Sequence, residues 1–84
     1  MRVVIEMSLP LYDRFVDRCN PASKEYALLK NGIIVRHEKD NQDERILEVH
    51  CDVEEAKGLL NLGRNIFPDA VPEIEKAIAA PRDS

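Results

Sequence analysis

Three residues that could take part in chemistry stand next to one another in the chain: His50, Cys51 and Asp52. A thiol beside an imidazole can act as a thiolate nucleophile, and all three side chains can ligate a metal ion. They end a segment in which apolar and polar residues alternate, a pattern that predicts a β-strand. Neighbouring strand residues point to opposite faces, so Cys51 shares a face with Leu47 and Val49, whereas His50 points away from it. We therefore expect no thiolate–imidazole pair.

Asp52 has a structural task in the sequence pattern. The segment that follows it, VEEAKGLLNLGRNIF, repeats its apolar residues at helical spacing. Asp52 with Glu55 three residues later is typical of a capping box, in which the carboxylate accepts hydrogen bonds from the first helical turn. The alternative hypothesis is a site at this strand–helix junction, formed by Cys51, Asp52 and His50. A helix N-terminus stabilises a thiolate, and such a site would make the protein a small enzyme or a ligand-binding protein.

Other patterns associated with catalysis or metal binding are missing from the sequence. The cysteines, Cys19 and Cys51, and the histidines, His37 and His50, show neither C-x-x-C nor H-x-x-x-H spacing, so we predict no metal and no cofactor. The chain has no glycine-rich phosphate loop and no G-x-S-x-G motif. Two cysteines are too few for a disulfide framework. These observations favour a protein that is not an enzyme.

Length and charge limit the class of protein further. Eighty-four residues make one small domain, which we place at residues 1–80, with a flexible tail at 81–84. The net charge is −4 and the basic residues are scattered, which argues against a nucleic-acid surface. The apolar run near the N-terminus is too short for a signal peptide or a membrane span. We therefore expect a cytoplasmic protein that binds neither nucleic acid nor membrane.

The periodicity of apolar residues predicts the main elements. Residues 2–7 alternate like a strand, and residues 8–20 change to helical spacing. Residues 45–51 form a second alternating segment, the segment 53–67 is helical, and a short helix closes the chain. An α+β fold with helices packed on one face of a small sheet accounts for this order.

The segment at residues 24–39 allows two interpretations. Asn31 and Gly32 stand between two apolar runs, and Asn-Gly is a strong signal for a β-hairpin turn. Residues 21–30 also contain good helix formers, so they could form a helix that ends near Gly32. The predicted order is therefore β-α-β-β-β-α-α or β-α-α-β-β-α-α. Both orders describe a three- or four-stranded, mostly antiparallel sheet.

The face of the sheet turned away from the helices carries aliphatic side chains framed by charged ones. Its predicted interface residues are Val4, Leu29, Ile34, Ile46, Arg36 and Glu48. Scattered exposed aliphatics are common, but an apolar stripe framed by charges is typical of a protein–protein interface. Self-association would also add the buried surface that so small a domain lacks. We expect a non-enzymatic interaction or regulatory module that forms a homodimer or binds a larger protein.

Overall fold

The fold is α+β, with the order β-α-α-β-β-α-α. The computed structural model describes the backbone of residues 2–39 and 42–81 and the side chains of residues 2–35 and 45–81. The elements are β1 (Arg2–Ser8), α1 (Leu9–Arg18), α2 (Lys24–Lys30), β2 (Ile33–Lys39), β3 (Gln42–Asp52), α3 (Val53–Ile66), the 3-10 helix η1 (Pro68–Ala70) and α4 (Val71–Ala79). Of the predicted C-terminal tail, residues 82–84 lie outside the described residues.

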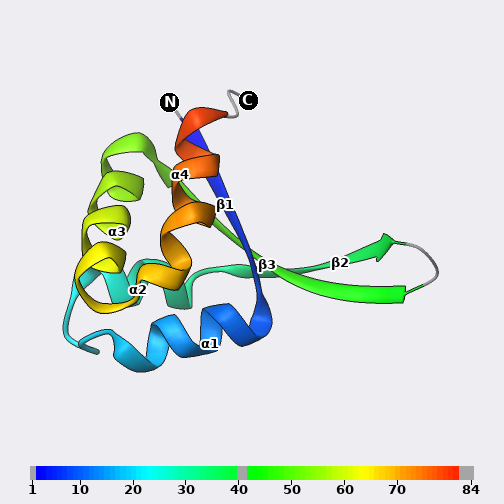
Figure 1. Ribbon diagram of the computed structural model, residues 1–84, viewed down its shortest axis with the longest axis horizontal. Coiled ribbons are helices and arrows are strands. Elements are labelled where there is room, and N and C mark those ends of the chain that lie inside the picture. Colours follow the sequence, from blue (N-terminus) through cyan, green and yellow to red (C-terminus); the bar gives the residue numbers. More distant parts are fainter. Residues whose placement is uncertain (1, 40–41, 82–84) are drawn as a thin grey trace.

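β3 is the central strand of the sheet, and it pairs antiparallel with β1 on one side and with β2 on the other. Ile5 pairs with Val49 in the first ladder, and Ile34 pairs with Leu47 in the second. The helices gather around β1 and the C-terminal half of β3, whereas β2 and the part of β3 paired with it extend away from them (Figure 1). β2 consequently has its extensive contacts with β3 rather than with a helix.

The core lies between the helices and one face of the sheet. Val3, Ile5, Met7, Leu47, Val49 and Cys51 are the buried strand residues, and Phe15, Leu29, Leu59 and Ile74 are fully buried residues of the four α-helices. The alternation along β1 and β3 explains this set, because every second residue of each strand points to the helices. The prediction that Cys51 points into the core is confirmed.

Residues 24–30 form helix α2, so of the two interpretations of this segment the helix is confirmed and the hairpin turn at Asn31 and Gly32 is wrong. The Ser23 hydroxyl accepts a hydrogen bond from the Tyr26 N–H at 3.2 Å and caps the start of the helix. Asn31 has a φ of −85°, whereas a two-residue hairpin turn of the Asn-Gly type needs a positive φ at both positions. Its N–H instead donates to the Ala27 carbonyl oxygen at 3.2 Å and ends the helix.

Gly32 allows the chain to pass close to the central strand at the start of β2. A Cβ atom at this position would lie 2.8 Å from Cδ2 of Leu47, which is closer than real side-chain atoms approach. Leu47 itself is buried. The glycine therefore marks a close approach between the α2–β2 connection and β3, and no hairpin turn is needed to account for it.

The burial of Leu29 and the exposure of Ile34 predict different losses of stability when each residue is replaced by Ala. Replacing Leu29 by Ala leaves a cavity in the core, so we expect Leu29→Ala to lower the free energy of unfolding by about 2–4 kcal/mol. Ile34→Ala removes a side chain that is 61% exposed and should cost less than about 1 kcal/mol. Urea unfolding measures both values. Equal losses at the two positions would contradict the placement of Leu29 in the core.

Candidate functional site

The junction between β3 and α3 is a helix cap. The Glu55 N–H donates to Oδ1 of Asp52 at 2.8 Å, and the Asp52 N–H donates to Oε1 of Glu55 at 3.1 Å. This reciprocal pair is a capping box, which confirms the role predicted for Asp52. Both carboxylates therefore hold the first turn of α3.

Cys51 is not an accessible nucleophile in this arrangement. Its side chain is 1% exposed, and burial together with the nearby carboxylates of Glu55 and Asp52 raises the pKa of its thiol to about 11. Burial also raises the pKa of Cys19, and both cysteines are free thiols. His50 lies on the opposite face of β3, where it contacts Glu48. The three adjacent residues of the junction do not converge on one point.

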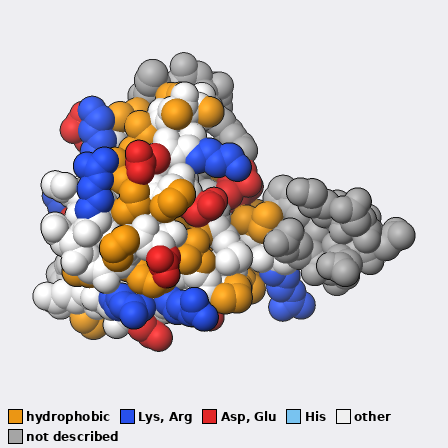
Figure 2. Space-filling model, viewed as in Figure 1, with side chains coloured by type: hydrophobic (Ala, Val, Ile, Leu, Met, Phe, Trp, Pro, Cys, Tyr) orange, Lys and Arg blue, Asp and Glu red, His pale blue; other side chains and the backbone are white. Residues whose placement is uncertain are grey.

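The described parts of the chain hold no group of three side chains able to bind a metal ion. None of the described helices is both long and apolar enough to cross a membrane. On the face shown in Figure 2, Lys and Arg side chains are interspersed with Asp and Glu side chains instead of gathering in one basic area. Among the described residues, the candidate site is therefore the sheet surface that faces away from the core.

This surface, called the outer face below, is defined by the strand register. Its members are Arg2, Val4, Glu6 and Ser8 of β1, Ile46, Glu48, His50 and Asp52 of β3, and Ile33 and Val35 of β2. Four branched aliphatic side chains belong to it, and three of them are close neighbours. Val35 pairs directly with Ile46, and Ile33 pairs with Glu48 one step along the same face. Ile33 is 56% exposed.

Three of the six predicted interface residues, Val4, Ile46 and Glu48, lie on the outer face. Leu29 does not, because it is buried on α2. Arg36 pairs with Arg45, but it falls in the part of β2 whose side chains are not described.

Ile34 also lies on the other face, because it pairs with Leu47 and directly paired residues point the same way. It is exposed there because β2 makes its extensive contacts with β3 and not with a helix. Ile33 and Val35 take its place on the outer face. The sequence prediction missed them because the side-chain parity of β2 follows from its register with β3, and no local pattern sets that register.

The polar part of the outer face combines a histidine with two carboxylates. Nε2 of His50 lies 3.1 Å from Oε1 of Glu48. Glu48 pairs across the ladder with Glu6, and His50 pairs with Val4. Two carboxylates thus occupy directly opposite positions on neighbouring strands, which is an unfavourable arrangement for like charges.

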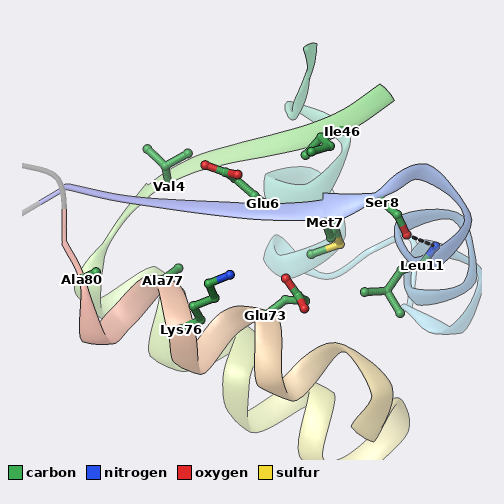
Figure 3. Close-up of a pocket in the computed structure, with 10 residues that line it drawn as sticks. All are labelled: Val4, Glu6, Met7, Ser8, Leu11, Ile46, Glu73, Lys76, Ala77 and Ala80. Carbon is green, nitrogen blue, oxygen red and sulfur yellow. Dashed lines mark hydrogen bonds between the residues drawn. The ribbon is translucent and has the colours of Figure 1, made fainter. Parts of the chain in front are cut away.

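A groove of about 600 Å³ follows the edge of the outer face along β1. Its lining residues are Val4, Glu6, Met7, Ser8 and Ile46 of the strands, Leu11 of α1, and Glu73, Lys76, Ala77 and Ala80 of α4 or its end. Val4, Glu6 and Ile46 point to the same side of β1, and Met7 points to the other (Figure 3). Lys76 extends from α4 toward β1 in the same view. The outer face is therefore hollowed at its β1 edge.

A comparison of the chain with protein-family models, with curated proteins and with solved structures found no match.

The burial of Cys51 and Cys19 predicts slow thiol chemistry. Iodoacetamide should alkylate both cysteines of the folded protein at pH 7.5 at least about tenfold more slowly than in urea, since only an accessible thiolate reacts. Mass spectrometry of timed samples counts the modified thiols. Rapid modification of Cys51 in the folded state would restore the hypothesis of a reactive site at the junction.

The raised pKa of Cys51 also predicts a loss of stability at alkaline pH. The folded state keeps the thiol protonated to about pH 11, whereas an unperturbed thiol loses its proton near 9.0. Above pH 9 the unfolded state therefore binds fewer protons than the folded state, and the free energy of unfolding falls as the pH rises from 9 to 11. Cys51→Val, which does not titrate, should show a shallower fall in urea unfolding over this range. Identical slopes would contradict the prediction.

Proposed function

We propose that this chain is a non-enzymatic protein-interaction domain that self-associates through the outer face of its sheet. The observation that carries the proposal is the set of aliphatic side chains on this face: Ile33, Val35, Ile46 and Val4. The four α-helices bury their apolar residues against the opposite face. Ile33 is more than half exposed, and the other three are partly exposed. Contiguous apolar surface with a charged rim is typical of a docking surface.

Energetic considerations support a partner on this face. Each square ångström of apolar surface removed from water stabilises the buried state by roughly 25 cal/mol. A domain of this size buries a comparatively small part of its surface by folding alone, so it gains more than a large domain does from association. Most soluble oligomers are symmetric and contain identical subunits, which favours a second copy as the occupant.

The shape of the sheet supports the same proposal. The groove between β1 and α4 opens onto the outer face, so a side chain of the partner could fill it. Interfaces draw much of their stability from a few side chains inserted into such hollows. β2 contributes an edge strand that no helix packs against extensively, and proteins usually cover or protect strands of this kind.

The alternative hypothesis of an enzyme or ligand site at Cys51, Asp52 and His50 has no observation in its favour. The thiol is buried, the Asp52 carboxylate caps α3, and the imidazole contacts Glu48 on the other face. We also propose that the protein acts in the cytoplasm, a reducing compartment in which two free cysteines persist.

Two isoleucines on opposite faces of the sheet allow a matched test of the proposal. Ile46→Asp introduces a charge on the outer face and should convert a dimer into a monomer at concentrations of about 100 μM. Ile34→Asp introduces the same charge on the other face, at a more exposed position, and should leave the dimer intact. Size-exclusion chromatography with light scattering measures the mass, and circular dichroism checks the fold.

Two results would contradict the proposal. The first is a wild-type protein that remains monomeric up to about 1 mM. The second is a dimer that Ile34→Asp disrupts and Ile46→Asp does not, because association would then involve the helix-side face or the edge of β2.

A further inference from the structure

β2 forms one edge of the sheet, because β3 is its only strand neighbour among the residues that the structure describes. The other edge strand, β1, has α4 packed along it, whereas β2 has its extensive contacts with β3 (Figure 1). An edge strand presents backbone N–H and C=O groups that can pair with a further strand, and proteins protect such edges with proline or with charged residues. The first three residues of β2, Ile33, Ile34 and Val35, include neither.

Two of these residues are exposed on opposite faces of the same strand. Ile33 lies on the outer face and is 56% exposed, and Ile34 lies on the other face and is 61% exposed. A partner packed on the outer face can cover Ile33 but not Ile34. A strand added at the edge can cover both, because its own side chains alternate between the two faces. The exposure of both isoleucines therefore favours a partner at the edge.

We propose that β2 pairs edge to edge with β2 of a second copy of this chain, antiparallel and centred on Ile34. The two-fold axis of this contact is perpendicular to the sheet and passes between the two Ile34 residues. It joins the two three-stranded sheets into one continuous sheet, with both outer faces on the same side. This contact is separate from the outer-face contact of the proposed function and does not depend on it.

The apolar run at the start of β2 is complementary to itself in this register. Ile34 pairs with the partner's Ile34, Ile33 pairs with the partner's Val35, and the symmetry repeats the second pair. Each of the three apolar residues thus gains an apolar neighbour across the new ladder. Cross-strand pairs of branched side chains stabilise a sheet.

Neighbouring registers lose this match. With the axis at Ile33, Ile34 would pair with the partner's Gly32, which has no side chain to cover it. With the axis at Val35, both isoleucines would pair with residues of the polar segment RHEK that follows. A run of three apolar residues therefore fits a second copy of itself in a single register, which favours self-pairing over an unrelated strand.

The size of the contact predicts its strength. Three apolar residues on each strand make a small interface, and small interfaces are typical of transient complexes. We therefore expect a dissociation constant of about 1 mM, so that the contact is largely absent at about 100 μM and forms when the protein is concentrated further.

Sedimentation equilibrium on Ile46→Asp tests the inference, because this variant lacks the outer-face contact. We expect its average mass to rise roughly 1.5-fold between about 100 μM and about 2 mM. Adding Ile34→Asp sets two carboxylates directly opposite each other on the two-fold axis, so the double variant should remain monomeric over the same range. Circular dichroism checks the fold of both proteins.

Cross-linking locates the axis. In the Ile46→Asp background, Ile34→Cys places two thiols at directly paired positions, with Cβ atoms about 5 Å apart. Ile33→Cys is similarly exposed, but its thiol lies diagonally from the partner's, at about 7–8 Å. Oxidised glutathione should therefore link Ile34→Cys at least about fivefold faster than Ile33→Cys on non-reducing gels, since a disulfide needs close Cβ atoms. Cys19 and Cys51 are buried and serve both proteins as a common background.

The possible failures separate this inference from the proposed function. Equal cross-linking rates, or an Ile46→Asp protein that stays monomeric up to about 2 mM, would overturn the inference and leave an outer-face dimer of the wild-type protein untouched. A wild-type dimer that Ile34→Asp disrupts and Ile46→Asp does not would support the inference and contradict the proposed function. A wild-type protein that is monomeric up to about 2 mM would overturn both.

Discussion

The pairing of β3 with its two neighbours is the constraint on which the rest of the structure depends. Because side chains alternate along this central strand, its register decides which residues enter the core and which form the outer face. Leu47, Val49 and Cys51 lie under the helices, and Ile46, Glu48 and His50 lie on the other side. A slip of one residue would exchange the two sets and bury a glutamate and a histidine. The chain therefore needs features that fix where β3 ends.

The capping box supplies one such feature. Asp52 is the last residue of β3 and at the same time the N-cap of α3, so its hydrogen bonds with Glu55 fix the boundary between strand and helix. The cost of burying the Cys51 thiol beside this boundary is small because the thiol stays protonated, as its raised pKa indicates. Of the three adjacent residues that suggested chemistry, Asp52 thus fixes the end of the central strand and Cys51 packs in the core beneath it.

Local signals in the sequence were sufficient for the elements whose neighbours in the chain determine them. The alternation in β1 and β3, the Asp52 cap and the apolar stripe of α3 all predict what is observed. The conformation of residues 24–30 could not be predicted from local signals alone. Asn31 and Gly32 favour a hairpin turn, whereas the residues before them are good helix formers. Tertiary contacts decide between them: Leu29 completes the core, and the Tyr12 hydroxyl donates to the Leu29 carbonyl oxygen at 3.0 Å.

For the same reason, the placement of the predicted interface residues on the outer face was correct for only some of them. Val4, Ile46 and Glu48 belong to strands whose parity could be derived from their own alternation. Leu29 and Ile34 were assigned through the hairpin, so a single wrong turn moved both to the wrong face. Ile33 and Val35 could not have been identified without the pairing of β2, since Ile33, Ile34 and Val35 form an unbroken apolar run with no parity of its own.

The division of the outer face into an apolar and a polar part has a consequence for specificity. Ile33, Val35 and Ile46 can bury area against almost any apolar surface, so by themselves they would not fix the position of a partner. Charged groups add little net affinity when they are exposed, but they exclude arrangements that bring like charges together. On a surface of this kind, repulsion between like charges therefore contributes to specificity, whereas apolar burial supplies the affinity.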